Sequence, residues 1–252
     1  MPADPAFAAV PAHLNPVIQG DLWLSWIARE GLTALALPPE AGGQGGTLAE
    51  LGRAARTLAR HAPGAAWVLW AQRLCIEQLH AAHNRAVADY LLPDLIAGDR
   101  AGACLLPSTS APVPLAARRL ERGWRLQGRL GLAANLQWAG FVLVAPACFE
   151  GGRRARVLLS GKNPGLAMEV SSAMLHQGDL WLAWIAREGL TALALPPEAD
   201  WHGTRTAELQ AQALFFRDDE ILDIADEPGA GLSAERLAEI AAVDRVLRAA
   251  LA

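Results

Sequence analysis

The chain has 252 residues, of which 52% are hydrophobic and 19% charged, with 22 basic and 26 acidic side chains. This composition excludes a disordered or collagen-like chain, because such chains lack the apolar residues that build a core. The acidic excess also argues against nucleic acid as a partner, since proteins that bind duplexes usually carry a basic surface. The length predicts one large domain or two small ones.

Residues 1–20 contain several prolines and lack the basic stretch followed by an apolar stretch that marks a signal peptide. Cys75, Cys104 and Cys148 are widely spaced and form no CxxC motif, which favours buried, reduced thiols over a disulfide framework or a zinc ribbon. We therefore expect a cytoplasmic protein.

One segment occurs twice, because residues 19–41 and 177–199 differ only at Ser25 and Ala183. This near identity indicates a duplication rather than a solenoid, whose repeats are shorter in period and looser in sequence. In each copy an aspartate and a glycine bound a short predicted helix, and we expect the following Thr-Ala-Leu-Ala-Leu run to be extended. The helix of the second copy, residues 179–188, should form an excursion from the surrounding β-structure.

Between and beyond the copies, hydrophobic spacing predicts further helices. Thr47 and Glu50 have the spacing of a capping box at the start of one helix. The next helix, about 65–80, is apolar nearly all round and should be central and buried. A third, about 82–97, should end at Gly98, and a last helix should begin at Ser233.

The middle of the chain reads as strands separated by turn residues. An arginine-rich hairpin is expected around residues 118–129. Its arginines either form a solvent-exposed face of the sheet or bind an anionic ligand. Residues 130–149 carry no charge and are long enough for a membrane span. Asn135, Gln137 and Pro146 interrupt that stretch, so two buried strands are expected there and no membrane span. The predicted strands are 102–106, 124–128, 140–145, 156–159 and 207–216.

Chemical motifs are weak. The glycine-rich loop at residues 41–46 could cradle a phosphate, but neither a dinucleotide-binding nor a P-loop pattern surrounds it, so a flexible loop is the other reading. His80 and His83 have a spacing that metal sites use, but no third ligand follows at a matching helical position, so we expect no metal. A GxSxG nucleophile motif is absent from the sequence. The residues therefore identify no catalytic group.

Four segments in order resemble the acyl-CoA dehydrogenase family of flavoproteins. They are GLTALALPPEAGGQGGTLAELGRAARTLARH at 31–61, LLPDLIAGDRAGACLL at 91–106, GWRLQGRLGLAANLQWAGFVLVA at 123–145 and GTRTAELQAQALFFRDDEIL at 203–222. The resemblance implies an α+β fold with a helical domain at 1–100 and a barrel- or sandwich-like β-domain at 101–228, interrupted by the repeat at about 177–199. The first helix of a C-terminal helical domain would occupy 229–252.

The resemblance also implies FAD, an acyl thioester substrate oxidised at a CH–CH group, and a homo- or hetero-oligomer. Leu106, Ala134 and Asn135 fall on the family's cofactor-binding motifs. At other motif positions Pro107, Val113 and Leu132 replace polar or aromatic side chains that touch flavin or substrate in the family, and its catalytic glutamate lies beyond the part that this chain matches.

Two functions therefore stay open. One is a flavin-dependent dehydrogenase that works with a partner chain. The alternative is a non-catalytic paralogue or protein-binding subunit that has lost flavin chemistry, and a flavin monooxygenase on the same scaffold is a third reading.

Overall fold

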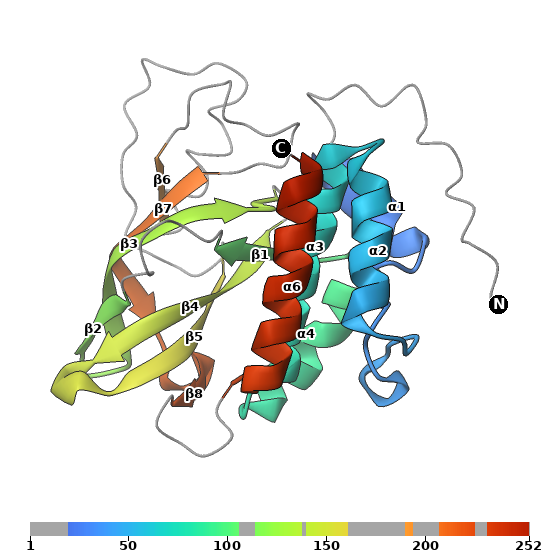
Figure 1. Ribbon diagram of the computed structural model, residues 1–252. Helices are drawn as coiled ribbons and strands as arrows, with labels where there is room; N and C mark the ends of the chain where they lie inside the picture. The colour runs from blue at the N-terminus through green and yellow to red at the C-terminus, as the bar shows by residue number, and fades with distance from the viewer. Residues whose placement is uncertain are drawn as a thin grey trace.

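The computed structural model describes residues 20–105, 114–137, 140–160, 190–193, 207–224 and 231–251 of the chain. Figure 1 shows helices gathered on one side of the molecule and a sheet on the other. The last helix stands upright beside the N-terminal helices, far from them in sequence. The expected α+β class is therefore confirmed.

The helices form where local sequence signals place them. Thr47 caps the second helix through a capping box: its backbone N–H donates to Glu50 at 2.7 Å, and the Glu50 N–H donates to the threonine hydroxyl at 3.2 Å. Gly98 ends the fourth helix in the left-handed conformation that glycine adopts without strain. The helices are α1 (Gly20–Arg29), α2 (Leu48–Ala59), α3 (Pro63–His80), α4 (Arg85–Ala97) and α6 (Ala234–Leu251), with a short 3-10 turn η2 (Pro39–Ala41).

The predicted extended run after α1 is wrong. Residues 32–36 form consecutive turns, and Ala36 has a positive φ of 62°. The glycine-rich loop explains the difference, because it folds back on these turns: Gln44 N–H donates to the Ala34 carbonyl and Ala36 N–H to the Gly45 carbonyl. These backbone groups of the loop are thus hydrogen-bonded within the chain.

The strands follow the predicted order, with β8 as an addition; β2 belongs to the expected arginine-rich hairpin and β6 to the expected extended run of the second copy. The strands are β1 (Ala101–Leu105), β2 (Leu115–Arg119), β3 (Trp124–Ala134), β4 (Phe141–Phe149), β5 (Arg154–Ser160), β6 (Leu190–Leu193), β7 (Ala207–Phe216) and β8 (Ile221–Ile224), with 3-10 turns η3 (Glu150–Gly152) and η6 (Asp218–Glu220). They are joined in the order β6-β7-β3-β1-β4-β5-β8. β1 pairs with residues 133–134 of β3 and 141–143 of β4. β2 pairs with the other ends of the same two strands, at residues 124–127 of β3 and 147–149 of β4.

The second copy of the repeat lies partly within the described residues. Its Leu190–Leu193 run forms β6 and pairs antiparallel with β7, so its extended conformation is confirmed over these residues. The predicted helix at 179–188 lies outside the described residues.

The buried helix α3 connects the two layers. It contacts α1, α2 and α4 on the helical side and β1 and β4 on the sheet side. Its apolar side chains are almost fully buried, as the all-round hydrophobic pattern predicted. Gly52 of α2 lies against Val243 of α6, where an added Cβ would sit 3.1 Å from a valine methyl. In the part of the chain that the structure describes, no helix is long and apolar enough to cross a membrane.

Candidate functional site

Asn135 follows β3 directly and lies at the centre of a buried amide cluster. Its side chain is fully buried and its φ is 65°. Its Nδ2 donates to Gln72 Oε1 and to the Gly102 carbonyl, each at 3.1 Å. Its oxygen accepts from Gln137 Nε2 at 2.7 Å. The side chain of this predicted cofactor residue is therefore engaged inside the protein.

Gln72 organises this cluster from the middle of α3. Its Nε2 donates to the carbonyls of Leu95 at 2.7 Å and Arg100 at 2.9 Å, and its Oε1 accepts from the Gly102 N–H at 2.6 Å. One side chain thus joins α3, the end of α4 and β1. Sequence reasoning passed over Gln72, although a glutamine in the middle of a helix expected to be buried signals a buried polar contact.

Ala134 is the second predicted cofactor residue that the structure describes. It pairs with Cys104 across β3 and β1 and packs in a small cluster with Ala71. Burial raises the pKa of the Cys104 thiol to about 12, so this sulfur is protonated and unreactive at neutral pH. The site therefore has an apolar lining beside the amide cluster.

The other positions of the family motifs are described only in part or not at all. Leu106, Pro107 and Val113 lie outside the described residues, and of Leu132 only the backbone, within β3, is described. All three cysteines are free of disulfides, and Cys75 and Cys104 are buried, in agreement with the expected reduced thiols. Across the described ranges, no three His, Cys, Asp or Glu side chains gather to hold a metal ion.

A buried charge cluster joins α3 to α6. Glu77 lies between two arginines: Arg73 Nη2 donates to it at 2.6 Å from the same helix, and Arg236 of α6 donates to both its oxygens at 2.8 and 2.9 Å. Burial lowers the pKa of Arg73 to about 10, and Glu77 opposes that shift. Both arginines therefore stay charged at neutral pH, and the carboxylate is held from two helices.

A second polar contact ties the same helices farther along. Trp70 Nε1 on α3 donates to Asp244 Oδ1 on α6 at 3.0 Å, and Arg248 donates to the other oxygen of this carboxylate at 2.7 Å. The Arg248 guanidinium also lies over the Trp67 ring, 5.3 Å from its centre. Polar contacts therefore join α3 and α6 at two places along their length.

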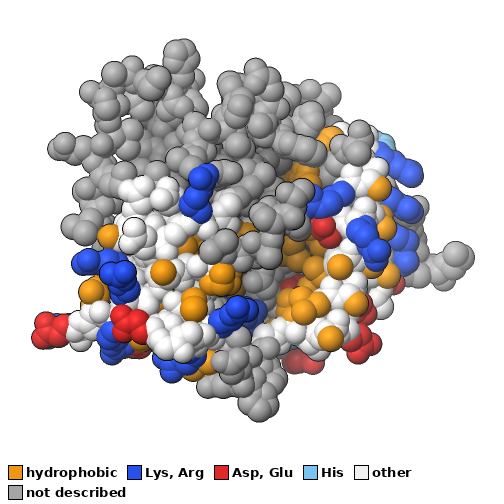
Figure 2. Space-filling model, turned by 60° about the vertical axis from the view of Figure 1, so that its left-hand side comes forward, with side chains coloured by type: hydrophobic (Ala, Val, Ile, Leu, Met, Phe, Trp, Pro, Cys, Tyr) orange, Lys and Arg blue, Asp and Glu red, His pale blue; other side chains and the backbone are white. Residues whose placement is uncertain are grey.

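The arginine-rich hairpin is confirmed as β2 and the start of β3, with Arg118 and Arg125 directly opposite each other. Arg119 donates to Asp218 at 2.6 Å, and Trp124 Nε1 donates to the same oxygen at 2.7 Å. These bonds, that from Arg119 first, hold the pKa of Asp218 below its usual value. Figure 2 shows basic side chains spread over the sheet side of the molecule.

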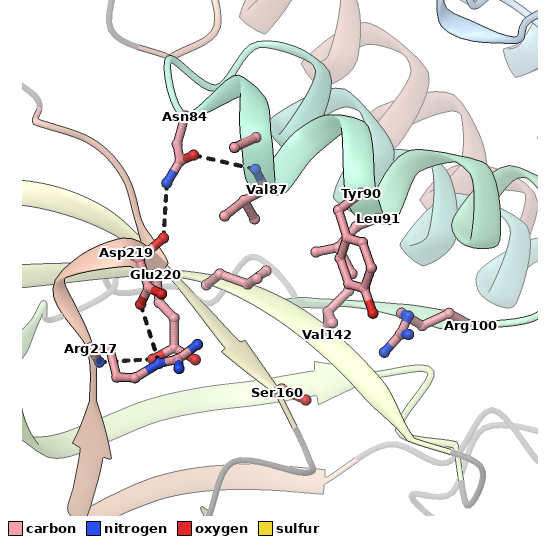
Figure 3. Close-up of a pocket in the computed structure, with 12 residues that line it drawn as sticks. Asn84, Val87, Tyr90, Leu91, Arg100, Val142, Ser160, Arg217, Asp219 and Glu220 are labelled. Carbon is pink, nitrogen blue, oxygen red and sulfur yellow. Dashed lines mark hydrogen bonds and ion pairs between the residues drawn. The ribbon is translucent and has the colours of Figure 1, made fainter.

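A cavity of about 410 Å³ lies between α4, the strands β4 and β5, and the turn η6. Figure 3 shows its residues, with Tyr90 and Arg100 at one end and Arg217 and Asp219 at the other. Apolar side chains from helix and sheet lie between these ends. They are Val87, Leu91, Val142 and Leu158. The volume falls in the range of ordinary small-molecule sites.

Comparison with known proteins shows which structures share this fold. The model of the acyl-CoA dehydrogenase N-terminal domain matches residues 15–99. A search of curated proteins found no match. Solved structures match over nearly the whole chain. The chain has the acyl-CoA dehydrogenase fold. The findings support its assignment to that family, as the sequence resemblance predicted.

Three of the matching structures illustrate the extent of this likeness. Glutaryl-CoA dehydrogenase from Mycobacterium smegmatis is 19% identical with a TM-score of 0.65, covering 92% of this chain and 52% of that one. A glutaryl-CoA dehydrogenase from the same organism in complex with FADH2 is 17% identical with a TM-score of 0.66, covering 95% and 56%. Butyryl-CoA dehydrogenase from Megasphaera elsdenii is 19% identical with a TM-score of 0.63, covering 92% and 55%. The chain thus spans about half the length of these acyl-CoA dehydrogenases.

The described side chains at the family's flavin positions do not fit a flavin. Ala134 has no hydrogen-bonding side-chain group, and every polar atom of the Asn135 side chain already has a partner within the protein. Ala134 therefore offers no side-chain hydrogen bond to FAD, and both amide hydrogens of Asn135 are already donated within the protein. Flavin binding at Leu106, Ala134 and Asn135 stays a prediction from the family resemblance.

Proposed function

We propose that this chain is a non-catalytic, protein-binding subunit built on the acyl-CoA dehydrogenase fold. The observation that carries this proposal is the closed amide cluster of Asn135, Gln72 and Gln137, which stands where the family resemblance places a flavin contact. Removing Asn135 from its partners would leave buried polar groups unpaired, which is costly. The cluster therefore favours a structural role for this residue.

The outward side of α6 supports the binding role. Leu237 is 51% exposed and Val246 is 40% exposed. The other exposed positions of α6 are five alanines and three charged residues: Ala234, Ala238, Ala241, Ala242, Ala249, Glu235, Glu239 and Arg245. The exposed leucine and valine with these alanines favour self-association or a partner protein. Light scattering after size exclusion should show an oligomer, and a well-behaved monomer would contradict this part of the proposal.

Reconstitution with flavin tests the non-catalytic role directly. The purified full chain is incubated with excess FAD and desalted, and its visible absorbance is compared with its protein absorbance. We expect no retained flavin and no change of the thermal unfolding midpoint on adding FAD. A yellow protein with flavin near a 1:1 ratio would refute the proposal.

The second candidate is the family's own reaction, FAD-dependent oxidation of a CH–CH group in an acyl thioester. The likeness of the fold to a glutaryl-CoA dehydrogenase in complex with FADH2 favours it. In this reading a partner chain would supply the flavin contacts and the proton-abstracting base that the described residues do not provide. A cytoplasmic location is a prediction under both readings.

Enzyme assays can overturn the first candidate. Acyl-CoA substrates of several chain lengths are offered to the chain with FAD and an artificial electron acceptor. The first candidate predicts no substrate-dependent reduction of the acceptor. Sustained turnover by the chain would instead support the dehydrogenase.

A further inference from the structure

The cavity beneath α4 is an amphipathic site that the family resemblance does not use. Its floor is apolar, and Val142 and Leu91 on that floor are 1% and 4% exposed. Its polar groups stand at two separate ends, as Figure 3 shows. A ligand with one polar end and an apolar body would match this division.

The polar groups at the η6 end are already engaged. Asn84 accepts a hydrogen bond from the Val87 N–H at 3.3 Å and donates to the carbonyls of Asp219 and Ile221, each at 2.9 Å. Arg217 Nε lies 3.2 Å from the Asp219 carboxylate. Asp219 and Glu220 place two carboxylates at this end, which disfavours a negatively charged ligand group here.

The opposite end keeps free hydrogen-bonding capacity. Arg100 Nη2 pairs with Asp94 at 3.2 Å, and the side chain is 26% exposed, so further guanidinium N–H groups are accessible to a ligand. In Figure 3 the Tyr90 hydroxyl lies at this same end of the cavity as the Arg100 guanidinium. A guanidinium N–H and a phenol O–H are both donors to a carboxylate oxygen.

We propose that this cavity binds an amphipathic monocarboxylate, with its carboxylate at Arg100 and Tyr90 and its apolar body over Val142 and Leu91. A single negative charge fits better than a phosphate dianion, because Asp94 already neutralises part of Arg100 and Asp219 lies across the cavity. This inference is independent of the proposed function and concerns different residues.

Tyr90 provides the probe, because it is the only tyrosine in the chain. Protein labelled with 3-fluorotyrosine gives one fluorine resonance, which reports on this cavity. We expect octanoate to shift that resonance saturably, whereas octan-1-ol, with the same chain length and no charge, shifts it far less. An absent shift, or an equal response to both compounds, overturns the proposal.

Two variants locate the binding within the cavity. Arg100→Gln should weaken octanoate binding about tenfold, because it removes a charge-assisted hydrogen bond. Ala86→Trp, at an exposed position on the rim, should block entry without disturbing the core and serves if the first variant unfolds. Arg53→Gln is the matched control, since Arg53 lies on α2, is 66% exposed and does not line the cavity. Unchanged affinity in both cavity variants would refute the assignment.

Discussion

The same four residues, Leu-Thr-Ala-Leu, adopt two structures in this molecule. In the first copy of the repeat, residues 32–35 form a turn packed against the helices, and Thr33 Oγ1 donates to the Ile96 carbonyl at 2.7 Å. In the second copy, Leu190–Leu193 form β6 and pair with β7. Local propensity is identical in both, so the contacts outside the segment select the conformation.

The residues that follow each copy explain the choice. In the first copy Gly43 lies so close to Leu37 that any Cβ would overlap the leucine carbonyl oxygen. The residue at the equivalent place after the second copy is Trp201. The glycine loop that bonds to residues 34 and 36 therefore follows the first copy of the segment and has no counterpart in the sequence after the second. The comparison teaches that the glycine loop, rather than the repeated segment, determines the turn.

The largest expected contrast comes from proline at equivalent alanines. Ala34 N–H donates to the Gly31 carbonyl at 3.2 Å in a buried turn, so Ala34→Pro should destabilise the protein by about 3 kcal/mol. Ala192 lies in a short strand at the end of the described sheet order, so Ala192→Pro should cost less than about 1 kcal/mol. Urea unfolding of both variants measures the difference, and equal losses would contradict the two-structure comparison.

Two glycine substitutions separate steric overlap from backbone strain in the first copy. Gly43→Ala should cost roughly 2–3 kcal/mol because the new methyl meets backbone atoms of Leu37. Gly45→Ala is the matched control. Gly45 has a φ of 72° but open space where a Cβ would stand, so this change should cost only about 1 kcal/mol. Chemical denaturation curves compare the two, and a smaller loss for Gly43→Ala would show that the loop can move away.

The threonine of the first copy gives a smaller effect. Thr33→Val removes the buried hydrogen bond to Ile96 and should lower the free energy of unfolding by about 1–2 kcal/mol. Thermal unfolding of this variant and the unchanged protein in one buffer measures the loss. Equal stability of the two would mean that the Thr33 hydroxyl does not stabilise the turn.

The smallest effect is expected at Ala36, whose φ of 62° is strained for alanine. Ala36→Gly relieves that strain but loses a buried methyl and gains unfolded-state entropy, so stability should change by about 0.5 kcal/mol or less. Calorimetry can resolve a shift of this size. A loss above about 2 kcal/mol would mean that packing of the methyl outweighs the strain.

Sequence reasoning succeeded where the determining signals are local. The Thr47 and Glu50 capping box and the Gly98 stop lie within one turn of the helix ends that they set. It failed at residues 32–36, where the determining bonds come from the glycine loop and from Ile96, 63 residues away from Thr33. It also gave no view of how Asn135 is used, since its partner Gln72 is 63 residues distant. Partners at such distances leave no periodic pattern in a single sequence.

The charge cluster of Arg73, Glu77 and Arg236 has a consequence for how the chain folds during synthesis. Arg236 lies 159 residues after Glu77, so the ribosome needs roughly 10–30 s to deliver it once Glu77 has been made. During that interval α3 lacks the helix that covers its polar face, and Trp70 lacks its Asp244 partner. A nascent chain should therefore stay accessible to proteases and chaperones at α3 until α6 has been translated.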